Sequence, residues 1–295
     1  MSASTITING KTVRLSLPVV IPESGIVGRE REMNKVLACW LKCDDDIPLS
    51  PLLIGAPGVG KNKIVYASSR ICASELYIFQ GHEDITAEDL FCSVRISDDR
   101  EQQMDYIMSP LVTAMIRGGI CFIDEIGKIR ARALAPLASL LDERRYLDSN
   151  LLGERIHAHP GFRLIAATNT SDMEQSRLPD FLASRMRPVI TIGYPDRKEV
   201  DTIITQHFSV QAKDHYADFL DLFWTLWRKC YKDKPPTPRD SLQIFGYAKK
   251  LADFESTGSS RPLSLTVSTQ GPLMSEKHLS QAFEAFSGHI QESEA

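Results

Sequence analysis

The sequence has no apolar run of about 18 residues, the length that a membrane-spanning helix needs. Its first ten residues are polar and lack the basic and apolar blocks of a secretory signal peptide. Its six cysteines are scattered, and only Cys39 and Cys43 lie close together. Because a metal site needs more ligands than this pair offers, we expect unpaired thiols in a reducing compartment. These absences predict a cytoplasmic protein without a membrane segment.

An excess of basic residues is also absent. The chain has 34 Lys and Arg against 38 Asp and Glu, a net charge of −4 at pH 7, so nothing suggests a protein that coats nucleic acid. A hydrophobic fraction of 43% and a charged fraction of 24% are ordinary for a globular protein. At 295 residues the chain exceeds what one core usually supports, which favours one large domain and one smaller domain.

Short apolar runs alternate with helical patterns through the first two thirds of the chain. The runs lie at 51–54, 76–79, 120–123, 162–167 and 189–192. Strands alternating with helices indicate a layered α/β domain, and unbroken apolar runs suit a parallel sheet covered on both faces. We therefore expect an αβα sandwich around a parallel five-stranded sheet. Thr86 and Asp89 have the spacing of a capping box that opens a further helix.

The two ends of the chain depart from this pattern. Asn9-Gly10 between β-forming residues predicts a hairpin. From residue 197 onward, apolar residues at helical spacing predict a small all-α domain, with one helix beginning at Pro238, where the missing N–H would be unpaired anyway. The expected divisions are an N-terminal hairpin extension at 1–23, a large α/β domain at 24–196 and a helical domain at 197–295.

A glycine-rich turn lies between a predicted buried strand and a predicted helix. Its sequence is Gly55-Ala56-Pro57-Gly58-Val59-Gly60-Lys61-Asn62. Glycines let the backbone curl so that its N–H groups face phosphate oxygens, and the helix N-terminus adds a favourable dipole. Lys61 would neutralise phosphate charge. Two glycines and a lysine at this spacing arise by chance on the order of 0.1 times in such a chain. The flanking strand and helix therefore favour a phosphate site over a bare turn.

A second motif, Ile120-Cys121-Phe122-Ile123-Asp124-Glu125, ends an apolar strand in two carboxylates. Open α/β sheets bind ligands at the carboxyl edge of their strands. There Asp124 would hold Mg²⁺ directly or through water, and Glu125 would polarise an attacking water. The alternative is a pair of surface acids that merely end a strand, which the nearby glycine-rich turn disfavours.

Asn62 occupies the position at which such a loop usually carries Ser or Thr, whose hydroxyl binds Mg²⁺. An amide oxygen can also face a hard cation, but it is longer and differently placed. We expect Asn62 to reduce metal affinity or turnover. It motivates an alternative function, a nucleotide-gated binding switch with weak hydrolysis.

The two motifs in this order resemble those of AAA+ ATPases, P-loop NTPases that form rings. The resemblance spans about residues 24–252 and looks closest to the MoxR-like and dynein-related branch. Ser109-Pro110-Leu111 departs from it, because the family more often has Gly-Pro-Leu there. The segments that carry the resemblance, besides the two motifs, are 25–30, 88–90, 109–111, 159–164, 166–169, 178–185, 194–196 and 237–239.

The resemblance implies roles for individual residues. The catalytic residues would be Lys61, Glu125, Asn169 and Arg185. The nucleotide-binding residues would be Val27, Gly28, Pro57, Gly58, Val59, Gly60, Lys61, Asn62, Lys63 and Arg239. Asn62 and Asp124 would hold the metal. Arg185 would be an arginine finger, with Arg187 as the alternative, and Arg239 would be a sensor in a helical lid.

The resemblance also implies ATP and Mg²⁺ as ligands and a homo-oligomeric ring, a hexamer in the family. MoxR-like relatives act as chaperones that remodel, mature or activate a partner, often a von Willebrand A-domain protein. An alternative is an NTPase motor subunit of a nucleic-acid-processing or defence complex, against which the acidic balance argues. The absence of a guanine-reading motif favours ATP. Partner specificity is expected in the N-terminal hairpin, in residues 81–108 or in a separate subunit.

Overall fold

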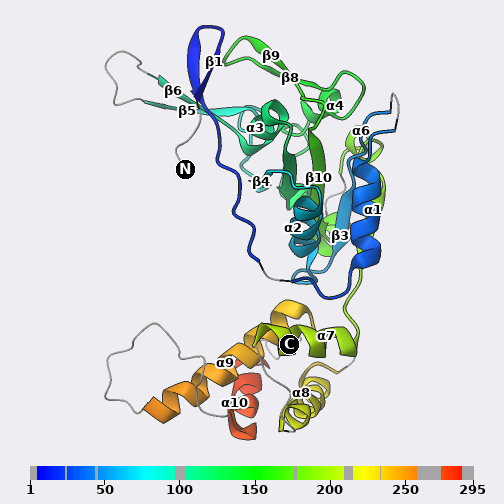
Figure 1. The fold of residues 1–295 in the computed structure, drawn as a ribbon, viewed down its shortest axis with the longest axis vertical. Helices are drawn as coiled ribbons and strands as arrows, with labels where there is room; N and C mark the ends of the chain where they lie inside the picture. Colours follow the sequence, from blue (N-terminus) through cyan, green and yellow to red (C-terminus); the bar gives the residue numbers. More distant parts are fainter. Residues whose placement is uncertain are drawn as a thin grey trace. The chain divides into compact units, whose positions relative to one another are not determined.

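The computed structural model describes residues 5–23, 25–43, 46–96, 104–175, 178–208, 215–232, 234–257 and 274–287. Its contacts divide the chain into two compact units, an α/β unit up to Gly193 and a helical unit from Tyr194 (Figure 1). The segment Pro57–Val59 groups with the helical unit although it lies within the first unit in sequence.

The α/β unit is built on a five-stranded parallel sheet, as the sequence predicts. Its strand order is β11-β3-β10-β7-β4. The strands are β3 (Leu52–Gly55), β4 (Leu76–Gln80), β7 (Ile120–Asp124), β10 (Arg163–Asn169) and β11 (Val189–Ile192). Every residue of Ile120–Ile123 is buried, which explains why these strands read as unbroken apolar runs rather than alternating ones.

Side chains that alternate along each strand fill a core on both faces of the sheet. Leu164 and Ala166 of β10 belong to the core cluster shared with α3 (Pro110–Arg117) and α4 (Leu137–Leu140). Ile165 and Ala167 are equally buried and point to the opposite face, because successive strand residues alternate. Two further helices pack on the sheet: α1 (Glu30–Trp40) contacts β11, and α2 (Lys61–Ile71) contacts β3. The unit is therefore an αβα sandwich.

A second sheet, which the sequence did not predict as a whole, has the order β1-β2-β6-β5. The Asn9-Gly10 hairpin is confirmed as β1 (Thr5–Ile8) and β2 (Lys11–Arg14). It continues through parallel pairing of β2 with β6 (Met104–Met108), which is antiparallel to β5 (Cys92–Ile96). The hairpin and part of residues 81–108, two of the three alternatives for partner specificity, are thus parts of one sheet.

The helix expected after Thr86 is wrong, although the capping contacts themselves form. The Thr86 backbone N–H donates to Asp89 Oδ2 at 2.8 Å, and the Asp89 N–H donates to Thr86 Oγ1 at 3.3 Å. The chain makes only turns there and enters β5 at Cys92. Burial of Leu90 and Phe91 and pairing of β5 with β6 prevail over the local helix signal.

The remaining short elements connect these layers. They are the hairpin β8 (Tyr146–Ser149) with β9 (Glu154–His157), the helices α5 (Thr170–Gln175) and α6 (Asp180–Ala183), and the single turn η1 (Ile126–Lys128). All six cysteines are free in the structure. Within the described part of the chain, no helix has both the length and the apolar character needed to cross a membrane.

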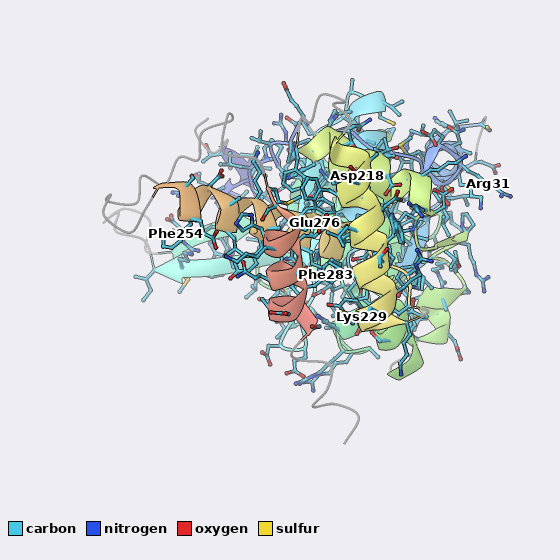
Figure 2. The ribbon with its side chains drawn as sticks, turned by 90° about the horizontal axis from the view of Figure 1, so that it is seen from below. Arg31, Asp218, Lys229, Phe254, Glu276 and Phe283 are labelled. Atoms are coloured by element: carbon cyan, nitrogen blue, oxygen red, sulfur yellow. The ribbon has the colours of Figure 1, made fainter. Side chains whose placement is uncertain are left out.

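The helical unit contains α7 (Arg197–His207), α8 (His215–Tyr231), α9 (Pro238–Thr257) and α10 (Glu276–Ser287). The start of α9 at Pro238 is as predicted. The core of the helical unit centres on Phe223, whose ring centroid lies 5.2 Å from that of Phe245 and 5.4 Å from that of Phe283. Figure 2 shows α8 and α10 side by side, with Phe283 on α10.

Phe223→Ala should lower the free energy of unfolding of the helical unit by about 3–5 kcal/mol, because it removes a fully buried ring and leaves a cavity. Denaturant titration followed by the fluorescence of Trp224 and Trp227, on the same helix, measures the change. Phe254→Ala is the matched control: its side chain is 57% exposed, and we expect a change within about 0.5 kcal/mol. Equal losses in the two variants would contradict the assigned core.

Candidate functional site

Lys61, Asn62, Asp124, Glu125 and Asn169 lie at the carboxyl edge of the five-stranded sheet. Asn169, the last residue of β10, is in register with Gly55, the last residue of β3. Asp124, the last residue of β7, is in register with Gln80 at the end of β4. Parallel pairing therefore ends four neighbouring strands at one edge, where the glycine-rich turn begins.

Lys61 starts α2 and is the most buried charged residue of this edge, with 7% exposure. The turn reaches it through Gly60, whose φ of 100° is a left-handed conformation that favours glycine. The ammonium donates to Gly55 O at 2.8 Å, Ala56 O at 3.1 Å and Asn169 Oδ1 at 2.8 Å. An ammonium has three donors, so these bonds satisfy a charge that would otherwise be costly to bury.

Asn62 and Asp124, the two predicted metal ligands, lie side by side. The Asn62 amide nitrogen donates to Asp124 Oδ2 at 2.9 Å. Adjacent oxygen ligands in the octahedral shell of Mg²⁺ lie about 2.9 Å apart. Rotation of the amide would place its oxygen where its nitrogen now lies, so this pair fits the edge of such a shell.

The rest of the shell would have to come from water and phosphate. In the described residues no group of three or more His, Cys, Asp or Glu side chains could hold a metal ion. Mg²⁺ usually keeps several waters and binds through one or two carboxylates and the substrate phosphates. A single carboxylate beside an amide is consistent with that mode of binding.

Glu125 follows β7 in a left-handed conformation, with φ 55° and ψ 39°, and its backbone N–H donates to Asp124 Oδ1 at 3.0 Å. Such a conformation costs a non-glycine residue on the order of 1–3 kcal/mol, which the surrounding contacts must offset. Glu125 Oε2 accepts from Gln80 Nε2 at 3.0 Å and pairs with Lys128 Nζ at 2.9 Å. The hydrogen bond from Lys128 to Glu125 raises the pKa of the Lys128 ammonium, which therefore stays charged.

Asn169 is oriented from two sides. Its amide nitrogen donates to Asp172 Oδ2 at 3.1 Å, so its oxygen points to Lys61. Asp172, Gln80 and Lys128 are contacts that the sequence analysis did not identify. Asp172 could have been predicted from its position, because it follows Asn169, the last residue of a strand, by three residues. The role of Gln80 could not be predicted from the sequence, because it depends on the order of the strands.

Arg185 does not join this cluster in the structure. It lies after α6, donates to Phe181 O at 2.8 Å and is 3.8 Å from Asp142 Oδ2. Arg187, the alternative, is exposed and donates to Ala183 O at 3.1 Å. The choice between the two fingers stays a prediction.

The other predicted nucleotide-binding residues lie before α1, on α2 and in the helical unit. Val27 is half-buried, and Gly28 has φ 65° just before α1. Lys63 is exposed on α2. In the helical unit the backbone of Gly58 lies so close to the start of α9 that an added Cβ would be 3.0 Å from the Arg239 Cβ. These roles remain predictions from the family resemblance.

A protein-family model matches part of the α/β unit. Residues 50–186 match the family described as the AAA domain of the dynein-related subfamily. This span contains the glycine-rich turn, strand β7 with Asp124 at its end, and strand β10 with Asn169 at its end. It ends just after Arg185.

Curated relatives match about half of the chain. An uncharacterized protein of Staphylococcus haemolyticus is 32% identical over 162 residues, which are 54% of this chain and 61% of the relative. An uncharacterized protein of Staphylococcus aureus is 29% identical over 169 residues, 57% of this chain and 64% of the relative. The match thus spans less than two thirds of these relatives.

Solved structures resemble a larger part of the chain. A mutant of Thermotoga maritima RuvB has a TM-score of 0.59 at 17% identity, covering 90% of this chain and 73% of that protein. A RuvB structure described as a Holliday junction branch migration motor has a TM-score of 0.55 at 16% identity, covering 88% and 70%. At these identities the likeness shows the fold alone.

Gly81→Ala should disturb this edge, because a Cβ at Gly81 would lie 2.6 Å from Glu125 O and 2.9 Å from Asp124 O. Both neighbours are backbone atoms, so the end of β7 must move. We expect a loss of about 1–3 kcal/mol in the free energy of unfolding, measured by denaturation. Gly193→Ala is the control, since its Cβ would meet nothing within 4 Å. An undiminished stability of Gly81→Ala would contradict the close approach.

Proposed function

We propose, from the premise that residues 50–186 form an AAA domain of the dynein-related subfamily, that this chain binds and hydrolyses ATP with Mg²⁺. The observation that supports it most is the convergence of the site residues at one sheet edge, where Lys61 donates to Asn169 and the neighbouring Asn62 donates to Asp124. Catalysis of phosphoryl transfer rests on positioning and charge neutralisation. A buried ammonium, an amide and a carboxylate spaced to bind Mg²⁺, and an oriented Asn side chain are the groups that this chemistry needs.

Each residue of the site would have its own role in ATP hydrolysis. Lys61 would exchange its carbonyl acceptors for phosphate oxygens. Asn62 and Asp124 would hold Mg²⁺, which neutralises charge on the phosphates when bound. Glu125 would orient the attacking water and accept its proton, after release from Gln80 and Lys128, which hold its carboxylate in the structure. Asn169, fixed by Asp172, would help to orient the same water.

Arg185 would complete the site from a neighbouring subunit. It makes no contact with Lys61 or Glu125 that would place it in its own chain's site, and it lies with Asp142 instead. A site completed between subunits calls for a homo-oligomeric ring. The resemblance to MoxR-like ATPases further supports a hexamer that acts as a chaperone on a partner protein, such as one with a von Willebrand A domain.

Glu125→Gln should bind ATP but hydrolyse it at least 100-fold more slowly, because the amide cannot accept the proton of the attacking water. Binding is measured with a fluorescent ATP analogue, and hydrolysis by phosphate release with Mg²⁺. Glu284→Gln, an exposed position on α10, is the control and should retain the parent rate. Hydrolysis by Glu125→Gln at the parent rate would overturn the assignment of Glu125 as the catalytic base.

A nucleotide-held switch with weak hydrolysis is the second candidate, and the bond from Asn62 to Asp124 favours it. This bond occupies the carboxylate that would face the metal. A hydrogen bond to a charged group contributes about 1.5–3 kcal/mol, so breaking it without compensation would weaken Mg²⁺ binding by about 10- to 100-fold.

Asn62→Thr tests this candidate. With a hydroxyl in the usual position, we expect the Mg²⁺ concentration for half-maximal hydrolysis to fall by about tenfold and the maximal rate to rise. Asn62→Ala, which removes every polar atom, should require more Mg²⁺ than the parent. A high parent rate that Asn62→Thr leaves unchanged would exclude the switch.

A further inference from the structure

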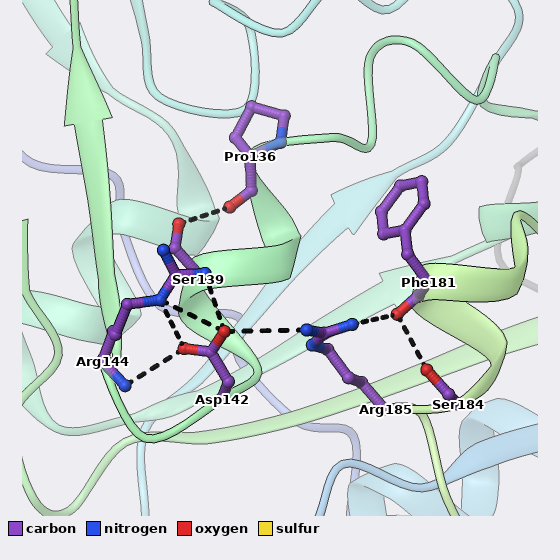
Figure 3. Close-up of polar contacts among 7 residues, drawn as sticks. All are labelled: Pro136, Ser139, Asp142, Arg144, Phe181, Ser184 and Arg185. Carbon is purple, nitrogen blue, oxygen red and sulfur yellow. Dashed lines mark hydrogen bonds and ion pairs between the residues drawn. The ribbon is translucent and has the colours of Figure 1, made fainter.

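A second group of charged residues surrounds Arg185, at a distance in sequence from both nucleotide motifs. Figure 3 shows Asp142 between two guanidinium groups, with Arg144 on one side and Arg185 on the other. Asp142 follows α4, and Arg185 follows α6, so the contact joins two elements. The Asp142 side chain is 19% exposed, and that of Arg185 is 34% exposed.

Only one of the two side-chain contacts of Arg185 can hold the guanidinium relative to the rest of the domain. Its Nη1 donates to Phe181 O at 2.8 Å, but Phe181 lies only four residues earlier, on the short helix α6 that Arg185 follows, and so moves with Arg185. The Asp142 carboxylate, 3.8 Å from Nη2, belongs to a different element. An arginine side chain has about 2 kcal/mol of rotamer entropy, so an anchor at its far end limits where the charge can go.

Asp142 is itself firmly held. Arg144 Nε donates to both carboxylate oxygens, at 3.0 and 3.2 Å, and Nη2 donates to Oδ2 at 2.8 Å. The Arg144 backbone N–H donates to Oδ1 at 3.1 Å. These bonds from Arg144 hold the pKa of the Asp142 carboxyl below its usual range, so the carboxylate remains charged at neutral pH.

The charges of this group do not cancel. One carboxylate is shared by two guanidinium groups, which leaves a net charge of +1 on the three side chains. Asp142 therefore holds Arg185 in place but neutralises only part of its positive charge, so Arg185 still attracts a phosphate. An isolated pair of one arginine and one acid would have no net charge and would attract a phosphate less.

We propose that Asp142 is a positioning residue that holds the Arg185 guanidinium ready for the nucleotide site of the neighbouring subunit. The inference rests on the proposed function. It is distinct from a simple structural tie between α4 and α6, because a positioning residue acts only in the chain that supplies Arg185.

Mixed rings test this difference. A Lys61→Ala chain supplies Arg185 but lacks the phosphate-binding lysine, and an Arg185→Ala chain has the reverse defect. Each alone should be inactive, and an equal mixture should recover hydrolysis at interfaces where the first chain serves the second. Asp142→Asn is then added to one chain at a time. Asn keeps an acceptor for the Arg144 N–H and removes the charge.

We expect Asp142→Asn in the Lys61→Ala chain to lower kcat of the mixture by about tenfold with little change in KM, because a loosely held Arg185 is misplaced in the transition state. In the Arg185→Ala chain the same substitution should have no effect. Asp148→Asn in the Lys61→Ala chain is the control: Asp148 pairs with Arg155 at 2.7 Å on the hairpin that follows and should not change the rate.

The outcomes separate the possibilities. An equal fall in kcat with Asp142→Asn in either chain would show a structural tie and overturn the inference. An unchanged rate with Asp142→Asn in the Lys61→Ala chain would also overturn it. If the Lys61→Ala and Arg185→Ala chains recover no hydrolysis when mixed, completion of the site between subunits is wrong, and so is the inference about Asp142. This mixture contains no change at Asp142, so its result separates a failure of the proposed function from a failure of the inference.

Discussion

The parallel pairing of β10 between β3 and β7 is the constraint on which the site depends. Its register places Asn169 opposite Gly55 and Ala166 opposite Ile123, so the three strands deliver Lys61, Asp124 and Asn169 to one edge. A slip by one residue would exchange the two buried faces of β10 and point Asn169 the other way. Burial of both faces makes such a slip costly. The core therefore sets the position of the polar groups as well as the stability of the sheet.

The polar groups at this edge are paired with one another. Lys61 donates to Asn169, Asn62 to Asp124, and Lys128 pairs with Glu125. Such pairing offsets the cost of holding charges away from water. Under the proposed function, phosphate and Mg²⁺ would replace these partners rather than enter an open cleft. Binding would then also free Glu125 and reorient the Asn62 amide, which couples ligand binding to the readiness of the site.

The sequence was sufficient for the parallel sheet and for the residues that end its strands, because long apolar runs and a fixed glycine spacing are local signals. It was insufficient where distant segments meet. The pairing of β2 with β6 depends on segments about ninety residues apart, and the partners of Glu125 and Arg185 depend on strand order and loop packing. Alternating apolar residues in Cys92–Ile96 did carry a strand signal, whereas the capping pattern at Thr86 misled because burial of the following residues prevailed.

The most direct test is the rate of ATP hydrolysis per subunit, with Mg²⁺, across a wide range of protein concentration. If neighbouring subunits complete each site, the rate per subunit should rise steeply as rings assemble and then reach a plateau. Arg185→Ala should remove that rise while ATP binding persists. A substantial rate per subunit that stays constant down to concentrations at which the protein is monomeric would contradict completion between subunits. A background rate throughout, with ATP bound, would contradict hydrolysis by this chain alone.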